Sequence, residues 1–398
     1  MQTSMRTALA IAVVAALSGA SHAADWELNP RVEAGYLYDD NYRLTPPGTE
    51  VSVQGPLADA QLEMRALTQQ GEFSFTPRIS ATYFPDHQDL DAVDYFGLLF
   101  WQHRGQRYMT QVRGEYSQQD VVNSEQPHAE IPADSGLGEG DTGDGGIVFL
   151  PNRRERAAVR PQVSFEMTQK QSLAFAANFA DVKFDEQFFG AQQDYQSGDV
   201  TAALVSRLSP VSSFTTRLRA AQYDIETLGD SKSYGAELQW DRRTAAELEA
   251  FVRVGAQNVK FEDGTKENSW LAGAGVSMPF GRNQLFADLV RSVGPSSAGR
   301  IITRDQLRLR WQRDFTPRLA FLLGLRGTHD EDISEVTNYR PRSYATGDIG
   351  LQWRWEQEFS LVMAYDYTWQ KFDESATDPA KSGAASISVI YQPLQRRR

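Results

Sequence analysis

Residues 359–369 read FSLVMAYDYTW, and this stretch decides the fold because its large apolar and aromatic side chains recur with a period of two. Every second position from Phe359 to Trp369 is apolar or aromatic, whereas Ser360, Asp366 and Thr368 stand between them. Successive side chains of a β-strand point to opposite faces. A period of two over about ten residues therefore predicts a strand with one apolar and one polar face.

The same alternation recurs along most of the chain, and helical spacing is nowhere sustained. Further apolar rows run through 60–66, 73–83, 157–167, 270–278 and 319–325. Short turns are expected at 69–71, 104–106, 168–171, 209–212, 242–246, 279–283, 314–318 and 356–358. Longer polar loops are expected at 40–56, 86–93, 117–154, 185–193, 226–232, 262–268, 293–303, 328–342 and 372–380. Eight turns alternating with nine loops predict eighteen strands, to within about two.

This order of connections predicts an all-β fold, a transmembrane antiparallel up-and-down β-barrel of about 18 strands over residues 24–391. Both termini would lie on the short-turn side, which is periplasmic in such barrels. A soluble sandwich also alternates, but its connections would not sort into short and long. Aromatic residues cluster near the predicted strand ends, as at the two interfaces of a membrane: Tyr36, Tyr38, Tyr83, Phe84, Trp101, Tyr223, Trp240, Trp270, Trp311, Trp353 and Trp369.

The two ends of the chain differ from the barrel. Residues 1–23 are typical of a secretory signal peptide, with Arg6 before a short apolar stretch and Ser21-His22-Ala23 as a small-x-small cleavage site. Residues 392–398 form a short basic tail after the last strand. We expect an exported protein of the Gram-negative outer membrane, in contact with its lipids and lipopolysaccharide.

Composition narrows the chemistry. The formal charge of -12 argues against nucleic acid as a partner, and no cysteine is present for a disulfide or a thiolate site. The five histidines have no chelating partner four residues away, and no nucleophile elbow or phosphate-binding loop occurs. Acidic runs at 86–94 and 330–335 are either solvated loops or calcium ligands, of which solvated loops are the commoner case. We therefore predict no catalytic residues, no cofactor, no resident metal and no enzyme.

The polar face of the strands is rich in arginine and poor in lysine. If the apolar face meets lipid, these arginines face the lumen, and two interpretations follow. One is a ladder of arginine–carboxylate pairs that stiffens the wall, with Arg65 beside Glu63 and Arg113 beside Glu115. The other is an electropositive track for anionic solutes. The residues predicted to line this path are Arg217, Arg219, Arg253, Arg304, Arg308, Arg310 and Arg326.

The longest predicted loop, 117–154, contains a glycine-rich run at 136–146. Glycine lets the backbone bend at low steric cost. The loop is therefore either a flexible outer loop or a segment folded into the lumen as a constriction.

The start of the predicted barrel, NPRVEAGYLYDDNYRLT at 29–45, resembles the opening of the β-barrel porin 2 family. Members often begin with a Gly-Tyr-x-Tyr-Asp-x-Asn-like strand, matched here from Gly35 to Asn41. The family includes outer-membrane proteins associated with exopolysaccharide gene clusters, so the resemblance implies a role in surface polysaccharide export. The arginine-rich lumen is also similar to the design of the alginate exporter, although no sequence motif is shared with it.

Two functional hypotheses follow. The first is a channel that exports an anionic exopolysaccharide or passes small anions. The second is a non-conducting structural or interaction barrel that supports a polysaccharide export machine through periplasmic export components.

Overall fold

The computed structural model describes residues 25–125, 150–187, 192–226, 228–244, 247–333, 340–373 and 378–393. The signal peptide predicted at 1–23, the glycine-rich run at 136–146 and the arginines of the basic tail lie outside these ranges.

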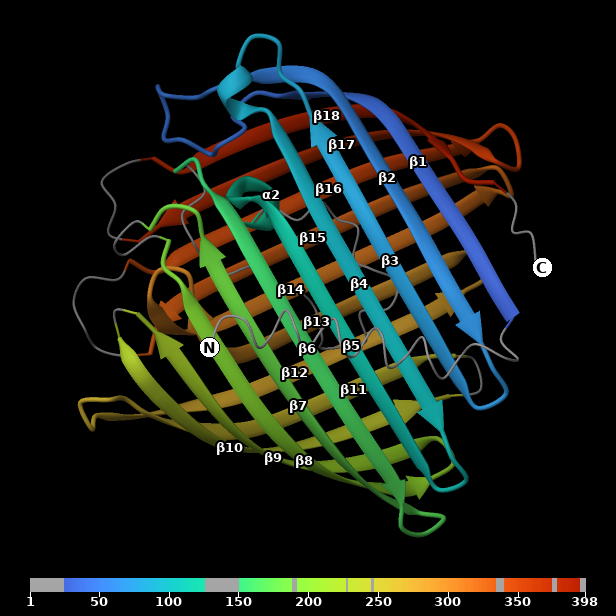
Figure 1. The fold of residues 1–398 in the computed structure, drawn as a ribbon, viewed down its shortest axis with the longest axis vertical. Coiled ribbons are helices and arrows are strands. Elements are labelled where there is room, and N and C mark those ends of the chain that lie inside the picture. Colours follow the sequence, from blue (N-terminus) through green and yellow to red (C-terminus); the bar gives the residue numbers. More distant parts are fainter. Residues whose placement is uncertain are drawn as a thin grey trace.

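Within the described residues, eighteen strands form one closed antiparallel sheet (Figure 1). They are β1 (Asp25–Asp39), β2 (Val53–Leu67), β3 (Gly71–Thr82), β4 (Ala92–Arg104), β5 (Tyr108–Asp120), β6 (Arg153–Glu166), β7 (Gln171–Phe184), β8 (Tyr195–Ser209), β9 (Ser212–Ile225), β10 (Gly229–Arg243), β11 (Glu249–Lys260), β12 (Lys266–Phe280), β13 (Asn283–Ser296), β14 (Arg300–Thr316), β15 (Leu319–Asp332), β16 (Arg342–Arg354), β17 (Phe359–Phe372) and β18 (Ala380–Tyr391). Each strand pairs with its neighbours in sequence, and β1 pairs with β18, so the sheet has no free edge. The predicted up-and-down barrel of eighteen strands is confirmed.

The barrel has two distinct ends. The end that carries the eight short turns, called the turn end, also holds both ends of the sheet at Asp25 and Tyr391. The opposite end, called the loop end, carries a short helix α2 (Val121–Glu125) and a 3-10 turn η1 (Gln88–Leu90). That the turn end faces the periplasm stays a prediction.

Two of the long loops expected from the sequence are wrong. Where a loop was expected at 226–232, β9 ends at Ile225 and β10 already begins at Gly229. Where a loop was expected at 293–303, residues 297–299 alone join β13 and β14. The serines and threonines around 292–303 continue the ladder instead of ending it, because the face of a strand turned away from lipid is polar in any case. Because these loops were predicted from polar composition alone, their predicted lengths were too great.

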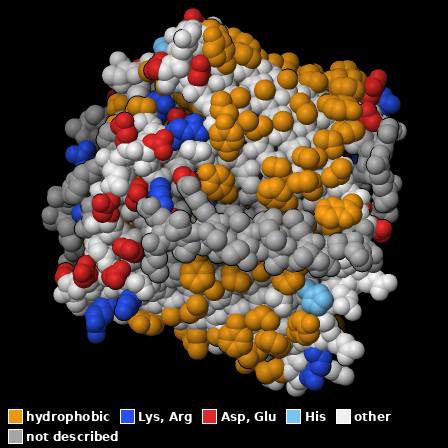
Figure 2. Space-filling view, viewed as in Figure 1, with side chains coloured by type: hydrophobic (Ala, Val, Ile, Leu, Met, Phe, Trp, Pro, Cys, Tyr) orange, Lys and Arg blue, Asp and Glu red, His pale blue; other side chains and the backbone are white. Residues whose placement is uncertain are grey.

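The outer surface of the barrel is an apolar belt. Leu218, Trp270 and Leu289 are each more than half exposed, and Figure 2 shows hydrophobic side chains covering the side of the barrel. Charged side chains gather instead along the loop end in the same view. Side chains that are costly to expose to water are favourable against lipid, so the belt marks the part of the barrel that lies in a membrane.

Among the described residues, no helix is long and apolar enough to cross a membrane.

Candidate functional site: the lumen and its mouth

Strand register decides which side chains line the lumen. On β13 and β14, Leu289 lies opposite Leu307 and Asp288 lies opposite Arg308. Leu289 is 57% exposed on the outer belt, whereas Asp288 is 3% exposed on the inner face. Neighbouring residues therefore face lipid and lumen in turn, as the alternation predicted.

The wall formed by β13, β14 and β15 holds two buried charge pairs, called here the paired wall. Arg304 donates from Nε and Nη2 to the two carboxylate oxygens of Asp330, at 2.5 and 3.0 Å. Arg308 makes the same two-pronged contact with Asp288. The carboxylates have no exposed side-chain surface, and the arginine side chains are 6–7% exposed. Planar guanidinium and carboxylate groups match in this geometry, which ties adjacent strands together.

The other predicted lumen arginines lie on the inner faces of β9, β11, β14 and β15. Arg219 contacts Asp199 at 3.0 Å, Arg253 lies 3.9 Å from Glu237, and Arg217 donates to the amide oxygen of Gln239 at 2.6 Å. Each contact crosses from one strand to a neighbouring strand, so the wall is cross-linked by side chains as well as by the backbone ladder.

Strand register places Arg310 in line with a second carboxylate, that of Asp348. In register, Arg310 is opposite Gly324, and Gly324 is opposite Asp348. A Cβ atom at Gly324 would lie 2.0 Å from Oδ1 of Asp348, so this glycine leaves the space that the carboxylate occupies. Arg326 is directly opposite Arg308, which is already paired.

The pairs expected within single strands are wrong. Arg65 donates to Glu72 on β3 at 2.6 Å, and Glu63 instead accepts from Asn29 at 2.9 Å. Glu115 contacts Arg156 and not Arg113. Residues two apart on a strand are separated by about 7 Å, whereas cross-strand neighbours have Cβ atoms about 5 Å apart, so the neighbouring strand usually supplies the partner.

A different wall, on β5 and β6, holds the arginine patch, defined as Arg113, Arg156 and Arg160 around Glu115. Glu115 lies 3.0 Å from Arg156 and 3.5 Å from Arg160, and Arg160 also donates to Asn178 at 3.1 Å. Among the described residues, none lies within hydrogen-bonding or ion-pairing distance of the Arg113 guanidinium. Glu115 thus contacts two of the three guanidinium groups, and the four side chains of the patch together carry a net positive charge.

Arg113 was missed as a site residue because the sequence suggested Glu115 as its partner. The signal that identifies it is the register of β5 and β6, which sets Arg113 directly opposite Arg160. Like charges in this position repel, and a bound anion would relieve the repulsion.

At the loop end, the lumen is narrowed by packed side chains, called here the mouth cluster. Its members come from strands around much of the barrel and from three connecting segments: Leu44, Val121, Val182, Phe184, Tyr195, Ala221, Tyr223, Ile225, Val259, Phe261, Leu271, Val293, Ile301, Tyr344 and Ala380. Leu44 and Val121 are each 1% exposed, and α2 lies within the outline of the barrel in Figure 1. These two segments therefore fold inward and bridge opposite walls.

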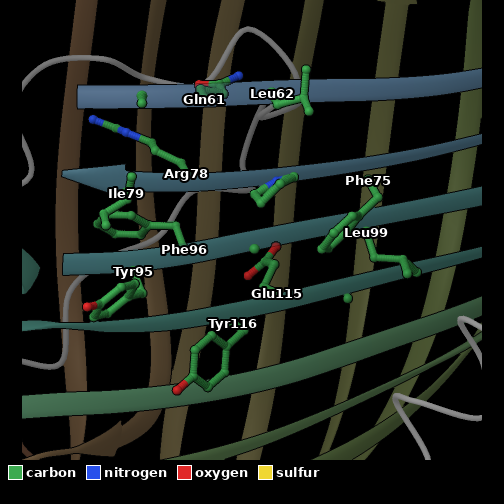
Figure 3. Close-up of a pocket in the computed structure, with 14 residues that line it drawn as sticks. Gln61, Leu62, Phe75, Arg78, Ile79, Tyr95, Phe96, Leu99, Glu115 and Tyr116 are labelled. Atoms are coloured by element: carbon green, nitrogen blue, oxygen red, sulfur yellow. The ribbon is translucent and has the colours of Figure 1, made fainter. Parts of the chain in front are cut away.

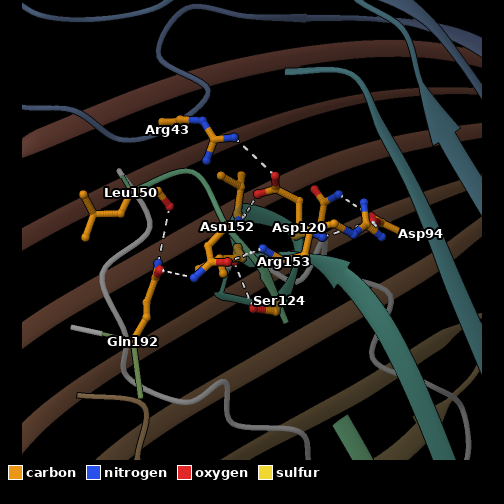
Figure 4. Close-up of polar contacts among 11 residues, drawn as sticks. Arg43, Asp94, Asp120, Ser124, Leu150, Asn152, Arg153 and Gln192 are labelled. Carbon is orange, nitrogen blue, oxygen red and sulfur yellow. Dashed lines mark hydrogen bonds and ion pairs between the residues drawn. The ribbon is translucent and has the colours of Figure 1, made fainter. Parts of the chain in front are cut away.

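Polar contacts hold the inward segments in place (Figure 4). Arg43 contacts Asp120 at 3.2 Å, and Asp120 accepts from the backbone N–H of Val122 at 2.9 Å, at the start of α2. The backbone N–H of Asp120 donates in turn to Asp94 on β4 at 3.0 Å. Leu44 adopts a left-handed backbone with φ of 48°, a conformation that costs free energy and is kept only where the surroundings enforce it.

Further links join the loops across the mouth. Asn152 donates to Gln192 at 2.7 Å, and the N–H of Gln193 donates to the carbonyl of Ser297 at 2.8 Å. The second contact joins the segment before β8 to the tip between β13 and β14, five strands away around the barrel. Burial raises the pKa of the nearby Tyr42 hydroxyl, so this group stays protonated at neutral pH.

Several residues of the acidic runs have structural partners, and Glu335 lies outside the described residues. Asp91 accepts from the N–H of Phe84 at 2.7 Å, Asp94 accepts from Asn123, and Asp330 pairs with Arg304. Among the described residues, no three histidine, aspartate or glutamate side chains are grouped closely enough to hold a metal ion.

Comparison with known proteins finds no matching family model and no matching curated protein. Solved structures of outer-membrane channels have a similar shape. Pseudomonas aeruginosa OccK2 in complex with glucuronate has 13% identity and a TM-score of 0.49, over 93% of this chain and 99% of that chain. Pseudomonas aeruginosa OpdK with vanillate has 13% identity and a TM-score of 0.49, over 94% and 99%. Acinetobacter baumannii OccAB3 has 10% identity and a TM-score of 0.48, over 94% and 100%.

At these identities no residue role is carried over from those channels, and the resemblance to the β-barrel porin 2 family stays a prediction. The chain's own architecture defines its class. A closed antiparallel sheet with an even number of strands, an apolar outer belt and a polar lumen is the architecture of Gram-negative outer-membrane barrels. The protein is an outer-membrane β-barrel.

Proposed function

We propose that this barrel is a channel for small anions. The observation that carries the proposal is the arginine patch, in which three arginines and a single glutamate lie together about halfway along the lumen wall. Barrels of this size leave an aqueous channel. In such a channel, a fixed positive charge raises the local concentration of anions and lowers that of cations.

In this proposal, the arginines predicted from the sequence line the path of the anions. They are Arg217, Arg219, Arg253, Arg304, Arg308, Arg310 and Arg326. The contacts of Arg304 and Arg308 with buried carboxylates favour a structural part for those two. Arg219 is about one-third exposed beside Asp199, so it remains within reach of a passing solute. Anion preference would then arise from the patch and from the exposed members of the track.

The mouth cluster favours small solutes over a polymer. Packed side chains bridge the walls at the loop end, so a chain of sugars would need Leu44 and Val121 to leave the lumen. Export of an anionic exopolysaccharide, with lipopolysaccharide and periplasmic export components as partners, therefore rests on the sequence resemblance alone.

The same packing supports a second candidate function. A barrel that is sealed at its mouth would conduct nothing and would instead support an export machine or bind surface polymer. The two candidates differ in one property, the steady conductance of the isolated protein.

The test is planar-bilayer conductance of the purified protein, with the reversal potential measured in a salt gradient. The channel proposal expects steady, anion-selective conductance that a small carboxylate such as glucuronate reduces and that an anionic oligosaccharide leaves unchanged. A correctly inserted barrel with no conductance would favour the structural candidate. Val121→Asp, which places a charge in the mouth cluster, should raise the conductance if the mouth limits it.

A further inference from the structure

The lumen wall carries an apolar strip that the polar character of the lumen does not explain. Phe96, Leu98 and Phe100 on β4 lie opposite Arg78, Thr76 and Ser74 of the inner face of β3 in register. All three side chains therefore face inward, and Leu98 is 38% exposed there. Apolar side chains facing water carry a free-energy cost, and an exposed apolar patch usually marks a binding surface.

Positive charge borders the strip on both sides. On one side, the Arg78 guanidinium lies 5.2 Å from the centre of the Phe96 ring, and both side chains are labelled in Figure 3. Arg78 is also paired with Asp59 at 2.6 Å, so its charge is balanced. On the other side, Arg113 lies directly opposite Phe100, and Arg160 follows it on β6.

A cavity of about 620 Å³ lies at this place in the wall. Gln61, Arg78, Phe96 and Glu115 belong to its lining, from four adjacent strands (Figure 3). Most of the lining consists of outward side chains, such as Phe75, Ile79 and Tyr95, and neither Leu98 nor Arg113 belongs to it. The cavity therefore opens mainly on the outer face of the wall, and the space beside the strip is the lumen itself.

We propose that the strip and the arginine patch together form a binding site for small monocarboxylates that carry an apolar body. The proposal rests on the lumen being open to solutes, as the proposed function requires. The carboxylate accepts hydrogen bonds from Arg113 and from the exposed part of Arg160, while the apolar body covers Leu98 and Phe100.

The chemistry of the site selects this class of ligand. A planar guanidinium binds a planar carboxylate through two parallel hydrogen bonds. The strip extends over about 14 Å along β4, which accommodates an aromatic ring or a chain of several carbons. Acetate has no apolar body and benzamide has no charge, so each lacks one of the two interactions.

The test is isothermal titration of the detergent-solubilised protein with benzoate, acetate and benzamide at neutral pH. Benzoate should bind roughly 10-fold more tightly than either of the others, because apolar burial and charge pairing act together. Arg113→Met should weaken benzoate binding by roughly 10- to 100-fold. Leu98→Gln should weaken benzoate binding while leaving acetate binding unchanged.

Matched controls separate the site from general effects on folding. Arg318→Met changes an exposed arginine at the turn end, and Val205→Gln changes an inward apolar residue on β8 outside the strip. Both should bind benzoate as the unmodified protein does. Circular dichroism of every variant confirms that the barrel is formed, and Arg113→Lys, which keeps the charge, should retain part of the affinity.

The outcomes distinguish this site from the channel proposal. The proposed site is overturned if benzoate binds no more tightly than acetate, or if Arg113→Met binds benzoate as tightly as the unmodified protein does. Either result overturns the site even if the barrel conducts anions. Benzoate binding that depends on Arg113 in a barrel that conducts nothing supports the site and overturns the channel.

Discussion

The paired wall and the arginine patch use the same residue type for two purposes. β14 and β5 are nine strands apart in a closed sheet of eighteen, so the two regions lie on opposite walls. Arg304 and Arg308 each have a buried carboxylate of their own, whereas Glu115 contacts both Arg156 and Arg160 and does not reach Arg113. The number of carboxylates within reach decides whether an arginine stabilises the barrel or stays available to a ligand.

The largest loss of stability is expected when one of the two buried charge pairs of the paired wall is broken. Asp288→Ala leaves the buried guanidinium of Arg308 without the carboxylate that it contacts. We expect the free energy of unfolding to fall by about 3–5 kcal/mol, the usual cost of breaking a buried pair. Urea unfolding of the refolded barrel in lipid measures it.

A double variant is the control for this prediction. Asp288→Leu with Arg308→Met removes both charges, and most of the lost stability should return because no buried charge is left uncompensated. Equal losses in the single and double variants would mean that the pair is not the source of the effect.

The next largest loss of stability is expected at Leu289, the neighbour of Asp288 on β13, which faces lipid. Leu289→Arg should lower the free energy of unfolding by about 2–4 kcal/mol, because the charge enters the middle of the bilayer. Tyr234→Arg, an equally exposed outward site nearer the loop end, should cost only about 0–1 kcal/mol. A larger loss at Tyr234 than at Leu289 would place the membrane differently along the barrel.

On the opposite wall, removal of an arginine should do little harm to stability. Arg113→Met deletes a charge that faces Arg160 and has no carboxylate partner among the described residues. We expect a gain of about 0.2–1 kcal/mol in the free energy of unfolding, from relief of like-charge repulsion. The same urea measurement checks it, and a loss comparable to that of Asp288→Ala would refute the contrast between the walls.

The smallest effect is expected at the mouth, at Asp194. Burial raises the pKa of this carboxyl above its usual 3.8, Glu226 and Asp181 add to the rise, and the N–H of Phe184 and the charge of Lys183 oppose it. Its contribution to stability is therefore greatest below pH 3.8 and is lost as the pH rises through the raised pKa.

Asp194→Asn should accordingly raise the melting temperature slightly at pH 7 and leave it unchanged at pH 3. The amide oxygen can still accept from Phe184, so the contact itself is kept. Circular dichroism at both pH values measures the difference. A lower melting temperature at pH 7 would show that the ionised carboxylate stabilises the mouth.

The barrel and its strand count could be predicted from the sequence because the alternation of apolar and polar side chains is a property of each strand by itself. Residues such as Leu289 and Asp288 reveal their faces without any knowledge of neighbouring strands. Partners could not be predicted in the same way, since Arg65 and Glu115 find theirs across the sheet. Strand register, which the sequence does not state, decides those contacts.

The mouth cluster was predicted only in part. A constriction of the lumen was one of two alternatives for the segment 117–154, to which Val121 belongs. Leu44 lies in a segment that was expected to be a polar loop, and only its contacts with distant strands show that it turns inward. The apolar strip on β4 was hidden because Phe96, Leu98 and Phe100 interrupt the alternation that identified the other strands.

The reversal potential in a potassium chloride gradient tests the contrast between the walls most directly. The protein should prefer chloride, Arg113→Gln should move the reversal potential toward zero, and the double variant Asp288→Asn with Arg308→Gln should leave it close to that of the unmodified protein. A reversal potential that is unmoved by Arg113→Gln but altered by the double variant would contradict the account.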